Sequence, residues 1–469
     1  MSSVISKIKF GTDGWRALMD TDYTMENLEL VTQAFADLMN DKKRGSSVVV
    51  GYDYRENSEV FARRAAEILA ANGLKTLLSS APCPTPAVSY TIVDEKYDAG
   101  VAITASHNPP RYNGFKIKNA IGSSAEKEIT DAVERLIGKN PVRRTGGAAN
   151  LSIRDINEKF IQNTKNYIKL DAIKAAPFRV LVDSMHGVGA HNIENILSGG
   201  KIQIKTIRGD RDITFGGVAP EPIAKYLKPS IELMKSGLYD IGVVTDGDAD
   251  RVGAIRPGGD FVSPGIILSL ILLHFVEDLK MTGGVVTTIS NTGLIYRIAR
   301  KLGVKVFETP VGFKYICEVM MKEKILIGGE ESGGIAFQGY LIERDGVLSS
   351  LLRLQMMARR GQTFDQILKS VEKEYGKFYY VRNDIDYPNE LKAKLFEKLA
   401  KNPPASFQGL KVERVNPADG MKFVLENDNW LLFRLSGTEP ILRVYAEASS
   451  QELADALVEE GKKLAFSVA

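Results

Sequence analysis

The feature that most constrains the fold of this chain is a recurring pair of segments, an apolar strand followed directly by a polar loop. The strands are rich in β-branched residues, and the loops are rich in Gly, Ser, Asp or Glu; the loops are Ser106-His107-Asn108, Asp246–Arg251 and Glu330–Gly334. Runs of this apolar kind are typical of buried strands, and open α/β sheets bind ligands at the carboxyl ends of their strands. The recurrence therefore predicts related domains that face one shared cleft.

Strand-like and helical segments also alternate along the chain. Residues 26–40 and 58–71 have helical periodicity, and a strand-like run at 47–51 lies between them. This alternation predicts a mixed or mostly parallel sheet with helices on both faces. With 469 residues, the chain is too long for one hydrophobic core, and a polar, glycine-rich stretch at 139–150 indicates a boundary. We expect three similar α/β domains and, because the last hundred residues carry several short strands, a smaller C-terminal α+β domain, all around one central cleft. The expected domains are 1–150, 151–258, 259–376 and 377–469.

Composition excludes several classes of protein. The chain has 61 basic and 58 acidic residues, a balance that calls for neither nucleic acid nor an anionic membrane. Its two cysteines, Cys83 and Cys317, argue against a disulfide framework and against a thiolate zinc site. The N-terminal residues lack the apolar segment of a signal peptide, and the most apolar run, 266–276, is too short to span a bilayer. We interpret that run as a buried helix, with His274 as a core or edge residue, and we expect a cytoplasmic enzyme.

Ser106 follows the apolar run 101–103, and Pro109 prevents this run from continuing as a central strand. A serine on such a turn, with His107 beside it and Lys116 ten residues on, fits an activated nucleophile. The alternative is an ordinary turn, because Ser, His, Asn and Pro are common turn residues. The segment is not a G-x-S-x-G nucleophile elbow, since the glycine positions are Thr104 and Asn108.

Three carboxylates, Asp246, Asp248 and Asp250, come directly after the strand-like run 241–245. Carboxylates gathered in this way repel one another unless a cation neutralises them, and Mg²⁺ or Ca²⁺ prefers such oxygen ligands. The spacing excludes an EF-hand, whose sixth and twelfth positions would be Gly and Glu rather than Arg251 and Pro257. A solvated acidic turn is the alternative.

Two further loops carry polar side chains of weaker diagnostic value. In G-G-E-E-S-G-G (328–334), the glutamates and Ser332 could accept hydrogen bonds from sugar hydroxyls. In R-L-S-G-T-E-P (434–440), the arginine fork and the backbone N–H groups could bind a phosphate, although an exposed turn arginine is the simpler interpretation. The pair Gly187 and Gly189 is only half of a dinucleotide fingerprint, and no segment fits a phosphate-binding P-loop.

The segment T-A-S-H-N-P-P-R-Y-N-G-F-K (104–116) closely resembles the phosphoserine loop of the α-D-phosphohexomutases, which include phosphoglucomutases and phosphomannomutases. D-G-D-A-D-R (246–251) resembles the metal loop of that family, and the loops at 328–334 and 434–440 resemble its sugar-binding and phosphate-binding loops. F-G-T-D-G-W-R (10–16) matches its N-terminal signature. The five motifs follow the family order across the whole chain.

The resemblance implies a role for each of these residues. Ser106 would carry a phosphoryl group and, together with the three aspartates, would hold Mg²⁺. Lys116 would be the general acid or base, with a pKa lowered by nearby positive charge, His107 would assist it, and Arg16 would approach the reacting phosphoryl group. The implied substrate-binding residues are Arg251, Gly312, Lys314, Glu330, Ser332, Arg434, Ser436, Gly437, Thr438 and Arg443.

The resemblance also predicts a reaction. The sugar loop ends in Gly334 rather than in histidine, and the segment 310–314 is similar to that of glucose-type enzymes. We therefore expect a phosphoglucomutase that interconverts glucose 1-phosphate and glucose 6-phosphate through a phosphoserine and glucose 1,6-bisphosphate, as a monomer or homodimer. The alternatives are a phosphomannomutase or dual-specificity phosphohexomutase, a phosphoglucosamine mutase, a metal-dependent sugar phosphatase and an inactive phosphorylated binding protein.

Overall fold

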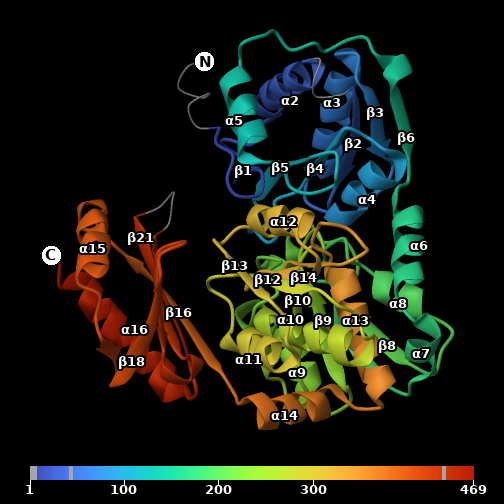
Figure 1. Ribbon diagram of the computed structural model, residues 1–469. Helices are drawn as coiled ribbons and strands as arrows, with labels where there is room; N and C mark the ends of the chain where they lie inside the picture. The colour runs from blue at the N-terminus through green and yellow to red at the C-terminus, as the bar shows by residue number, and fades with distance from the viewer. Residues whose placement is uncertain (1–7, 42–45, 436–439, 469) are drawn as a thin grey trace.

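The computed structural model describes residues 8–41, 46–435 and 440–468, and it places their strands in four sheets. We call the units built on these sheets domains I to IV, in chain order. In Figure 1 domain I lies at the top, domains II and III lie together below it, and domain IV stands to one side. Among the described residues, no helix combines the length and the apolar character that crossing a bilayer requires.

Domain I has a six-stranded sheet in the order β1-β5-β4-β2-β3-β6. Strands β2, β3, β4 and β6 are parallel. Strand β5 runs in the opposite direction, because it is antiparallel to β4, and β1, which is antiparallel to β5, runs in the same direction as β4. Helices α2, α3 and α5 pack on one face of this sheet and α4 packs on the other. The strands are β1 Trp15–Leu18, β2 Ser47–Tyr52, β3 Lys75–Ser79, β4 Ala99–Ile103, β5 Tyr112–Lys118 and β6 Leu151–Arg154; the helices are α2 Met25–Asn40, α3 Ser58–Ala71, α4 Thr85–Glu95 and α5 Lys127–Leu136.

The first sheet extends beyond the boundary that we expected at residue 150. Strand β6 begins at Leu151 and pairs in parallel with β3, so it completes sheet I. The polar, glycine-rich stretch before it is a connection within the domain and not a linker between domains. A boundary predicted from composition fell there because such a connection and a linker are both polar and rich in glycine.

Domains II and III share one hydrophobic core, which contains residues from both of their sheets. Sheet II has the order β11-β10-β9-β7-β8 and sheet III the order β13-β12-β14-β15, and each joins parallel strands to an antiparallel edge. In domain II the elements are α6 Asn157–Tyr167, α7 Leu170–Ala175, β7 Arg179–Asp183, α8 Asn192–Leu197, β8 Gln203–Ile207, α9 Lys228–Lys235, β9 Ile241–Thr245, β10 Val252–Ile255 and β11 Phe261–Val262. In domain III they are α10 Pro264–Leu273, β12 Gly284–Thr288, α11 Gly293–Leu302, β13 Val306–Thr309, α12 Phe313–Lys322, β14 Ile325–Gly329, β15 Ile335–Phe337, α13 Gly346–Arg360 and α14 Phe364–Tyr375.

Helix α10 is the most apolar run of the sequence, and nearly all of its residues are buried, as expected. It continues into a π-helical turn at His274–Asp278. The ring of His274 is buried, and it contacts Asp278 and Gln355 through hydrogen bonds of 2.8 and 2.9 Å. His274 is therefore a core residue with both ring nitrogens paired.

Domain IV differs from the other three, as the sequence predicted. Its sheet, β16-β21-β20-β19-β18-β17, is antiparallel throughout, and α15 and α16 cover one face of it. The opposite face combines an apolar cluster around Trp430 and Leu432 with three arginines, Arg382 on β16, Arg434 on β20 and Arg443 on β21. The elements are β16 Tyr379–Asp386, α15 Asn389–Lys401, β17 Ser406–Phe407, β18 Leu410–Asn416, β19 Met421–Leu425, β20 Trp430–Leu435, β21 Ile441–Ala448 and α16 Gln451–Phe466.

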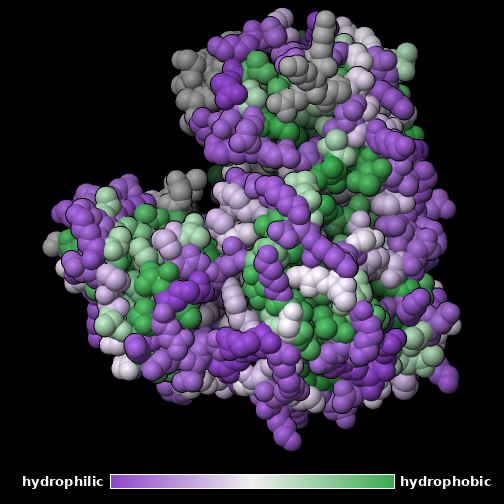
Figure 2. All heavy atoms as spheres, viewed as in Figure 1, coloured by the Kyte–Doolittle hydropathy of each residue, from purple (hydrophilic) through white to green (hydrophobic). Residues whose placement is uncertain are grey.

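The fold brings the predicted loops together. Strands β4, β9 and β14 end at the Ser106 turn, the aspartate loop and the sugar loop, and an isolated bridge between Arg251 and Gly334 joins the last two. Figure 2 shows a deep indentation between domain IV and the rest of the molecule. Two adjoining cavities, of about 540 and 640 Å³, are lined by residues of several domains and share Arg434 and Arg443. This is the cleft that the sequence predicted.

Candidate active site

Ser106 lies at the end of β4 with its side chain fully buried. Its Oγ donates a hydrogen bond of 2.7 Å to Asp246 Oδ2, so a domain I serine meets the aspartate loop of domain II. The backbone φ of Ser106 is +52°, a left-handed conformation that is uncommon for residues other than glycine. Such strain is typical of functional turns that the surrounding structure holds in place.

The three aspartates converge as predicted. Each of Asp246, Asp248 and Asp250 offers one oxygen, and these atoms lie within 4.8 Å of one another in a fully buried position. Oδ1 of Asp248 and Oδ1 of Asp250 are buried without a hydrogen-bond partner among the described residues. Burial and the two neighbouring carboxylates raise the pKa of Asp246 well above its ordinary value. A buried set of hard oxygen donors with unpaired lone pairs fits Mg²⁺.

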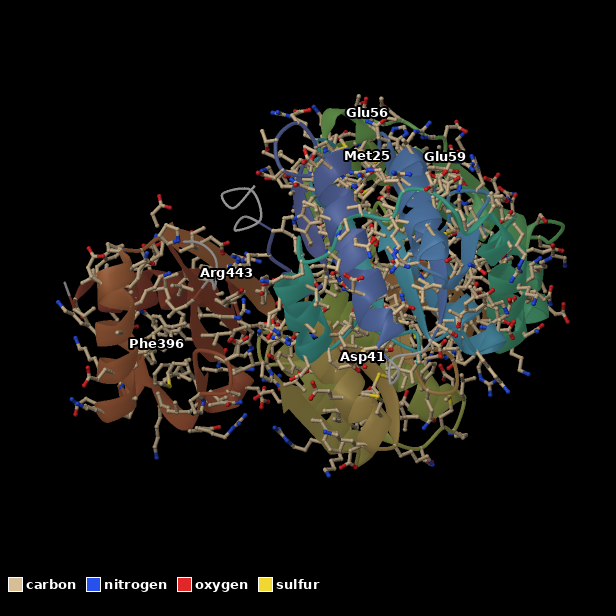
Figure 3. The ribbon with its side chains drawn as sticks, turned by 90° about the horizontal axis from the view of Figure 1, so that it is seen from above. Met25, Asp41, Glu56, Glu59, Phe396 and Arg443 are labelled. Atoms are coloured by element: carbon tan, nitrogen blue, oxygen red, sulfur yellow. The ribbon has the colours of Figure 1, made fainter. Side chains whose placement is uncertain are left out.

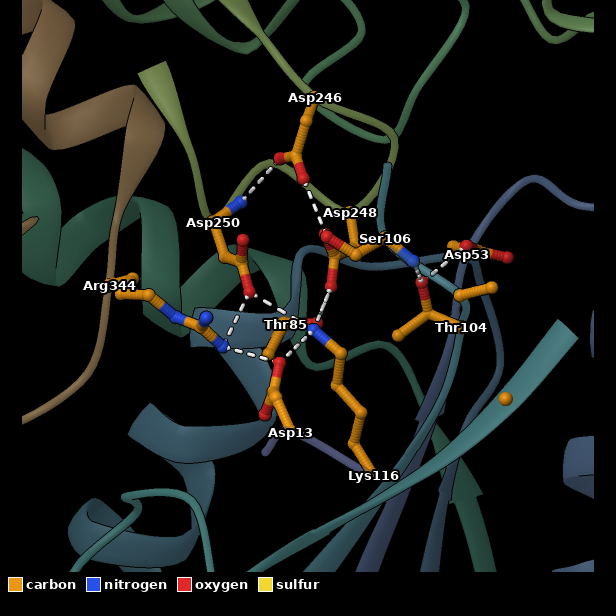
Figure 4. Close-up of polar contacts among 12 residues, drawn as sticks. Asp13, Asp53, Thr85, Thr104, Ser106, Lys116, Asp246, Asp248, Asp250 and Arg344 are labelled. Atoms are coloured by element: carbon orange, nitrogen blue, oxygen red, sulfur yellow. Dashed lines mark hydrogen bonds and ion pairs between the residues drawn. The ribbon is translucent and has the colours of Figure 1, made fainter. Parts of the chain in front are cut away.

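Lys116 projects from β5 into this carboxylate cluster (Figure 4). Its Nζ lies 2.7 Å from Asp248 Oδ2, 3.1 Å from Asp250 Oδ2 and 2.9 Å from Asp13 Oδ2. Burial opposes a charge on Lys116, but the three carboxylates outweigh it and raise the pKa of the amine above its ordinary value. The prediction of a lowered pKa was wrong, because anions and not cations are the nearest neighbours of this amine.

Sequence reasoning missed Arg344, which precedes α13 and is almost completely buried. Its Nη2 lies 2.7 Å from Asp13 Oδ2 and 2.9 Å from Asp250 Oδ2, and its Nη1 lies 3.9 Å from Glu330 Oε2. One domain III guanidinium thus contacts carboxylates from domains I and II (Figure 4) and also approaches Glu330 of the sugar loop. Nothing local marks this arginine in the sequence, since its partners in domains I and II are far away along the chain.

Arg16, His107 and Arg251 line the cavity of about 540 Å³ beside the aspartate loop. Arg16 Nη1 donates to Asn108 Oδ1 at 2.9 Å and lies 3.5 Å from His107 Nδ1. Burial, together with the positive charges of Arg251 and Arg16, lowers the pKa of His107 well below its ordinary value, so the ring is neutral at physiological pH. The structure therefore gathers all of the predicted catalytic side chains in one place.

The sugar-loop candidates line the same cavity. Glu330, Ser332 and Gly312 all contribute to its wall, whereas Lys314 lines the adjoining cavity of about 640 Å³. Burial raises the pKa of Glu330 to about 7. A Cβ on Gly334 would lie 2.2 Å from Arg344 Cδ, so a side chain at this position would displace that arginine.

Arg434 and Arg443 are directly opposite each other on β20 and β21, and both line the two cavities. Arg434 Nε lies 2.7 Å from Asp419 Oδ2, and the same oxygen accepts the N–H of Val311 at 2.9 Å. Figure 3 shows Arg443 on the side of domain IV that faces domain I. The other three predicted phosphate-loop residues, Ser436, Gly437 and Thr438, lie outside the described residues.

Two further cavity residues of domain IV were not predicted. Arg382 lies opposite Tyr445 across β16 and β21, with its guanidinium carbon 5.5 Å from the tyrosine ring centroid, and both line the cavity of about 540 Å³. Asp384 fixes the arginine through hydrogen bonds of 2.7 and 2.6 Å. The alternation of side chains along β16 could have indicated that these residues share a face, but not that this face lines the cleft.

Comparison with known proteins accounts for nearly all of the chain. Residues 7–144, 158–259, 264–375 and 388–463 match domain I, domain II, domain III and the C-terminal domain of phosphoglucomutase/phosphomannomutase, in that order. A phosphoglucomutase/phosphomannomutase of Thermococcus kodakarensis is 31% identical, and the match covers 97% of this chain and 98% of the relative. A Pyrococcus abyssi protein described as a probable phosphoglucosamine mutase is 33% identical, with 97% of each chain covered.

Among solved structures, a Thermus thermophilus protein described as a putative phosphomannomutase superposes with a TM-score of 0.87 at 36% identity, and the match covers 98% of this chain and 99% of the other. The domain matches follow the order of the family, and the cleft at their junction holds the motifs that the sequence had singled out. The chain therefore belongs to the phosphoglucomutase/phosphomannomutase family of α-D-phosphohexomutases, and it is an intramolecular phosphotransferase.

Proposed function

We propose that this protein is a phosphoglucomutase that interconverts glucose 1-phosphate and glucose 6-phosphate through phosphorylated Ser106 and glucose 1,6-bisphosphate. The observation that carries the proposal is the pairing of two anion sites across one cleft. Arg16, His107 and Arg251, which lie beside the contact between Ser106 Oγ and Asp246, line the same cavity as Arg434 and Arg443 of domain IV. A mutase must hold a phosphate at each end of its bisphosphate, whereas a phosphatase needs only one such site.

The aspartate loop supports the charge requirement of phosphoryl transfer. Mg²⁺, when bound, would be held by Asp246, Asp248, Asp250 and an oxygen on Ser106, and it would neutralise the charge that develops on the transferring group. Arg16 and Arg251 lie at the same end of the cavity and would orient that group through their guanidinium forks. Because phosphoryl transfer involves no change of oxidation state, these residues need only position the group and balance its charge.

Proton transfer accompanies each phosphoryl transfer. The attacking sugar hydroxyl must lose a proton, and Ser106 Oγ must gain one as it leaves. Lys116, whose pKa is raised, keeps a proton that it can supply, while the neutral ring of His107 can accept one. The two roles are exchanged when the bisphosphate returns its other phosphate to Ser106.

The middle of the cleft would hold the sugar ring. Glu330 and Ser332 are placed to accept hydrogen bonds from ring hydroxyls that lie between the two phosphates in either orientation. Glucose is favoured over mannose because the loop ends in Gly334, whose position leaves no room for a histidine beside Arg344. Glucosamine is the second candidate sugar, because a relative at 33% identity is described as a probable phosphoglucosamine mutase.

The test is an assay with glucose 1-phosphate, mannose 1-phosphate and glucosamine 1-phosphate, each with Mg²⁺ and a trace of the matching 1,6-bisphosphate. We expect glucose 6-phosphate to form fastest. Ser106→Ala should lose several orders of magnitude in rate, because the covalent carrier is removed, while its circular dichroism stays native. Release of free phosphate would indicate a phosphatase, and near-normal turnover by Ser106→Ala would contradict the mechanism.

A further inference from the structure

We propose that Arg55 is the positioning residue that holds the Ser106 turn in its reactive conformation. Arg55 follows β2, the parallel neighbour of β4, and its side chain is fully buried beneath the turn. The inference rests on the proposed role of Ser106 as phosphoryl carrier. It assigns a function to the Asp53-Tyr54-Arg55 segment, which contributes no lining residue to the cavity of about 540 Å³.

A single guanidinium binds the backbone of the turn at four points. Arg55 Nη2 donates to the carbonyl oxygens of Ser106 and Asn108 at 2.7 and 2.6 Å, and Nη1 donates to those of Pro109 and Tyr112 at 2.9 and 3.0 Å. Only arginine has a rigid, planar fork with enough donors for this arrangement. A lysine could keep the positive charge but could not bridge all four carbonyls.

The N–H of Ser106 is also linked to Arg55, through Thr104 and Asp53. It donates to Thr104 Oγ1 at 2.9 Å, and this hydroxyl donates in turn to Asp53 Oδ2 at 2.6 Å. Asp53 Oδ2 lies 3.2 Å from Arg55 Nε, and Asp53 Oδ1 accepts the N–H of Arg55 at 3.0 Å. Both the carbonyl and the N–H of Ser106 are therefore fixed by the Asp53–Arg55 pair, which explains how a serine is held at a φ of +52°.

Domain II closes over the other side of the turn. A Cβ on Gly247 would lie 2.5 Å from the carbonyl oxygen of Ser106, and the Phe215 ring centroid lies 5.0 Å from the guanidinium carbon of Arg55. The turn is thus held from below by Arg55 and limited from above by the aspartate loop. Without Arg55, the carbonyl oxygens of the turn, including the buried one of Ser106, lose their guanidinium donors. Relaxation of the turn would then move Ser106 Oγ away from Asp246.

Within the described part of the chain, Arg55 contacts the backbone of the Ser106 turn but no residue proposed to bind the sugar or the distal phosphate. Loss of these Arg55 hydrogen bonds should therefore slow phosphoryl transfer and leave substrate binding unchanged. General destabilisation of the protein would not give this result. The matched control is Arg353, another fully buried arginine, which donates to the carbonyl oxygens of Ser349 and Gly253 away from the turn.

The experiment compares wild type, Arg55→Lys and Arg353→Lys. Each protein is dephosphorylated and mixed with glucose 1,6-bisphosphate and Mg²⁺, and phosphorylation of Ser106 is followed by intact mass in a single turnover. We expect transfer by Arg55→Lys to be about 100-fold slower than by wild type, the order of loss for a displaced reacting group, with little change in KM for glucose 1-phosphate. Arg353→Lys should transfer at the wild-type rate, even if its melting temperature falls as much as that of Arg55→Lys.

Equal transfer rates for Arg55→Lys and Arg353→Lys would overturn the inference. If Arg55→Lys does not fold, Thr104→Val provides the deciding measurement, because it removes the acceptor of the Ser106 N–H with little change in shape. Folded Thr104→Val should be slow in transfer with KM preserved, and a wild-type rate would overturn the inference. Failure of wild-type Ser106 to accept any phosphoryl group would instead contradict the proposed function.

Discussion

At the scale of single residues, the site is a balance of buried charges. Asp13, Asp248 and Asp250 are neutralised by Lys116 and Arg344, and hydrogen-bonded contacts between these groups are between 2.7 and 3.1 Å long. Although burial opposes it, the neighbouring Arg344 and Lys116 hold the pKa of Asp13 well below its ordinary value. Buried ions are tolerated only when they are paired in this way, so each of these charges depends on the others.

Glu330 should give substrate binding a dependence on pH near neutrality. Burial raises its pKa from 4.5 to about 7, and only the ionised carboxylate accepts hydrogen bonds with both of its oxygens. KM for glucose 1-phosphate should therefore fall as the pH rises through about 7. The measurement is KM for wild type and for Glu330→Gln from about pH 5.5 to about 8.5, in steps of about half a unit. The ratio of the two KM values removes the effect of the titration of the substrate phosphate, which is common to both proteins. A ratio that does not change with pH would contradict this role.

The same raised pKa of Glu330 should also affect stability. Stability should fall as the pH rises, whereas substrate binding should become stronger. The pKa of Glu330 is about 7 in the folded protein and 4.5 in the unfolded chain. Between these two pH values, the folded protein therefore holds a proton that the unfolded chain has lost. The contribution of the protonated carboxyl is fully present below pH 4.5 and is lost as the pH rises through about 7. Urea unfolding of wild type and Glu330→Gln should therefore diverge as the pH increases across this window.

Asp248→Asn should lower kcat by about 10-fold or more, because it removes an anionic ligand of the proposed metal site, a larger change than the loss of a residue that only orients a ligand. It should also raise the Mg²⁺ concentration needed for half-maximal rate. The amide retains the hydrogen bond from Thr85 Oγ1, which is 2.6 Å long in the native protein, so circular dichroism should stay native. A wild-type activity that does not respond to Mg²⁺ after treatment with a chelator would exclude the metal assignment.

At the scale of elements, the site depends on how closely two strand-end loops approach. The backbone of Gly247, after β9, lies against the carbonyl of Ser106, after β4, and Gly187 lies against Asp246 and Gly247 from the third side. No side chain fits between these segments. The glycines are therefore required by contact between loops, a reason that neither loop reveals by itself.

Gly247→Ala tests this contact. The added Cβ would lie 2.5 Å from the Ser106 carbonyl oxygen and 3.0 Å from Pro220 Cγ, so the aspartate loop must move away from the turn. We expect slower phosphorylation of Ser106 and weaker Mg²⁺ dependence, with KM for the sugar phosphate nearly unchanged. Intact-mass analysis and a Mg²⁺ titration of the purified variant check this, and wild-type values in both would show that the loops are not in mutual contact during catalysis.

At the scale of the whole molecule, buried ion pairs set how the domains meet. Lys118 pairs with Glu343 between domains I and III, and Lys422 lies 3.2 Å from Glu308 between domains III and IV. Breaking a buried pair of this kind costs about 3–5 kcal/mol, whereas an exposed pair contributes about 0–1 kcal/mol. The buried pairs, rather than the surface pairs, therefore contribute most of the electrostatic stabilisation between these domains.

Arg434→Ala tests whether domain IV anchors the distal phosphate. The intermediate must release this anchor to turn round, and a weaker anchor should let the bisphosphate escape and leave Ser106 dephosphorylated. We expect a higher KM and an activity that decays unless glucose 1,6-bisphosphate is supplied, as progress curves with and without it would show. Lys398→Ala, on the helical side of domain IV, is the control and should behave as wild type. If Arg434→Ala also behaves as wild type, the anchor lies elsewhere.

The sequence by itself determined the local structure and the identity of the reacting groups. Apolar runs that end at Ser106, Asp246 and Glu330 predicted strands with polar loops at their carboxyl ends, and those strands are β4, β9 and β14. The change of architecture near residue 375 was also visible, because short alternating strands have a different period from the preceding helices. These features could be predicted because each depends on residues that are consecutive in the sequence.

Only the tertiary structure decided which charges meet. Arg344, Arg55 and Arg382 have ordinary sequence surroundings, and they acquire roles because the fold brings segments that are far apart in the sequence to one place. The direction of the Lys116 pKa shift was mispredicted for the same reason, since it depends on which side chains lie within about 4 Å. Electrostatic interactions act through space and not along the chain, so their partners are fixed by the packing of the domains and cannot be predicted from sequence spacing.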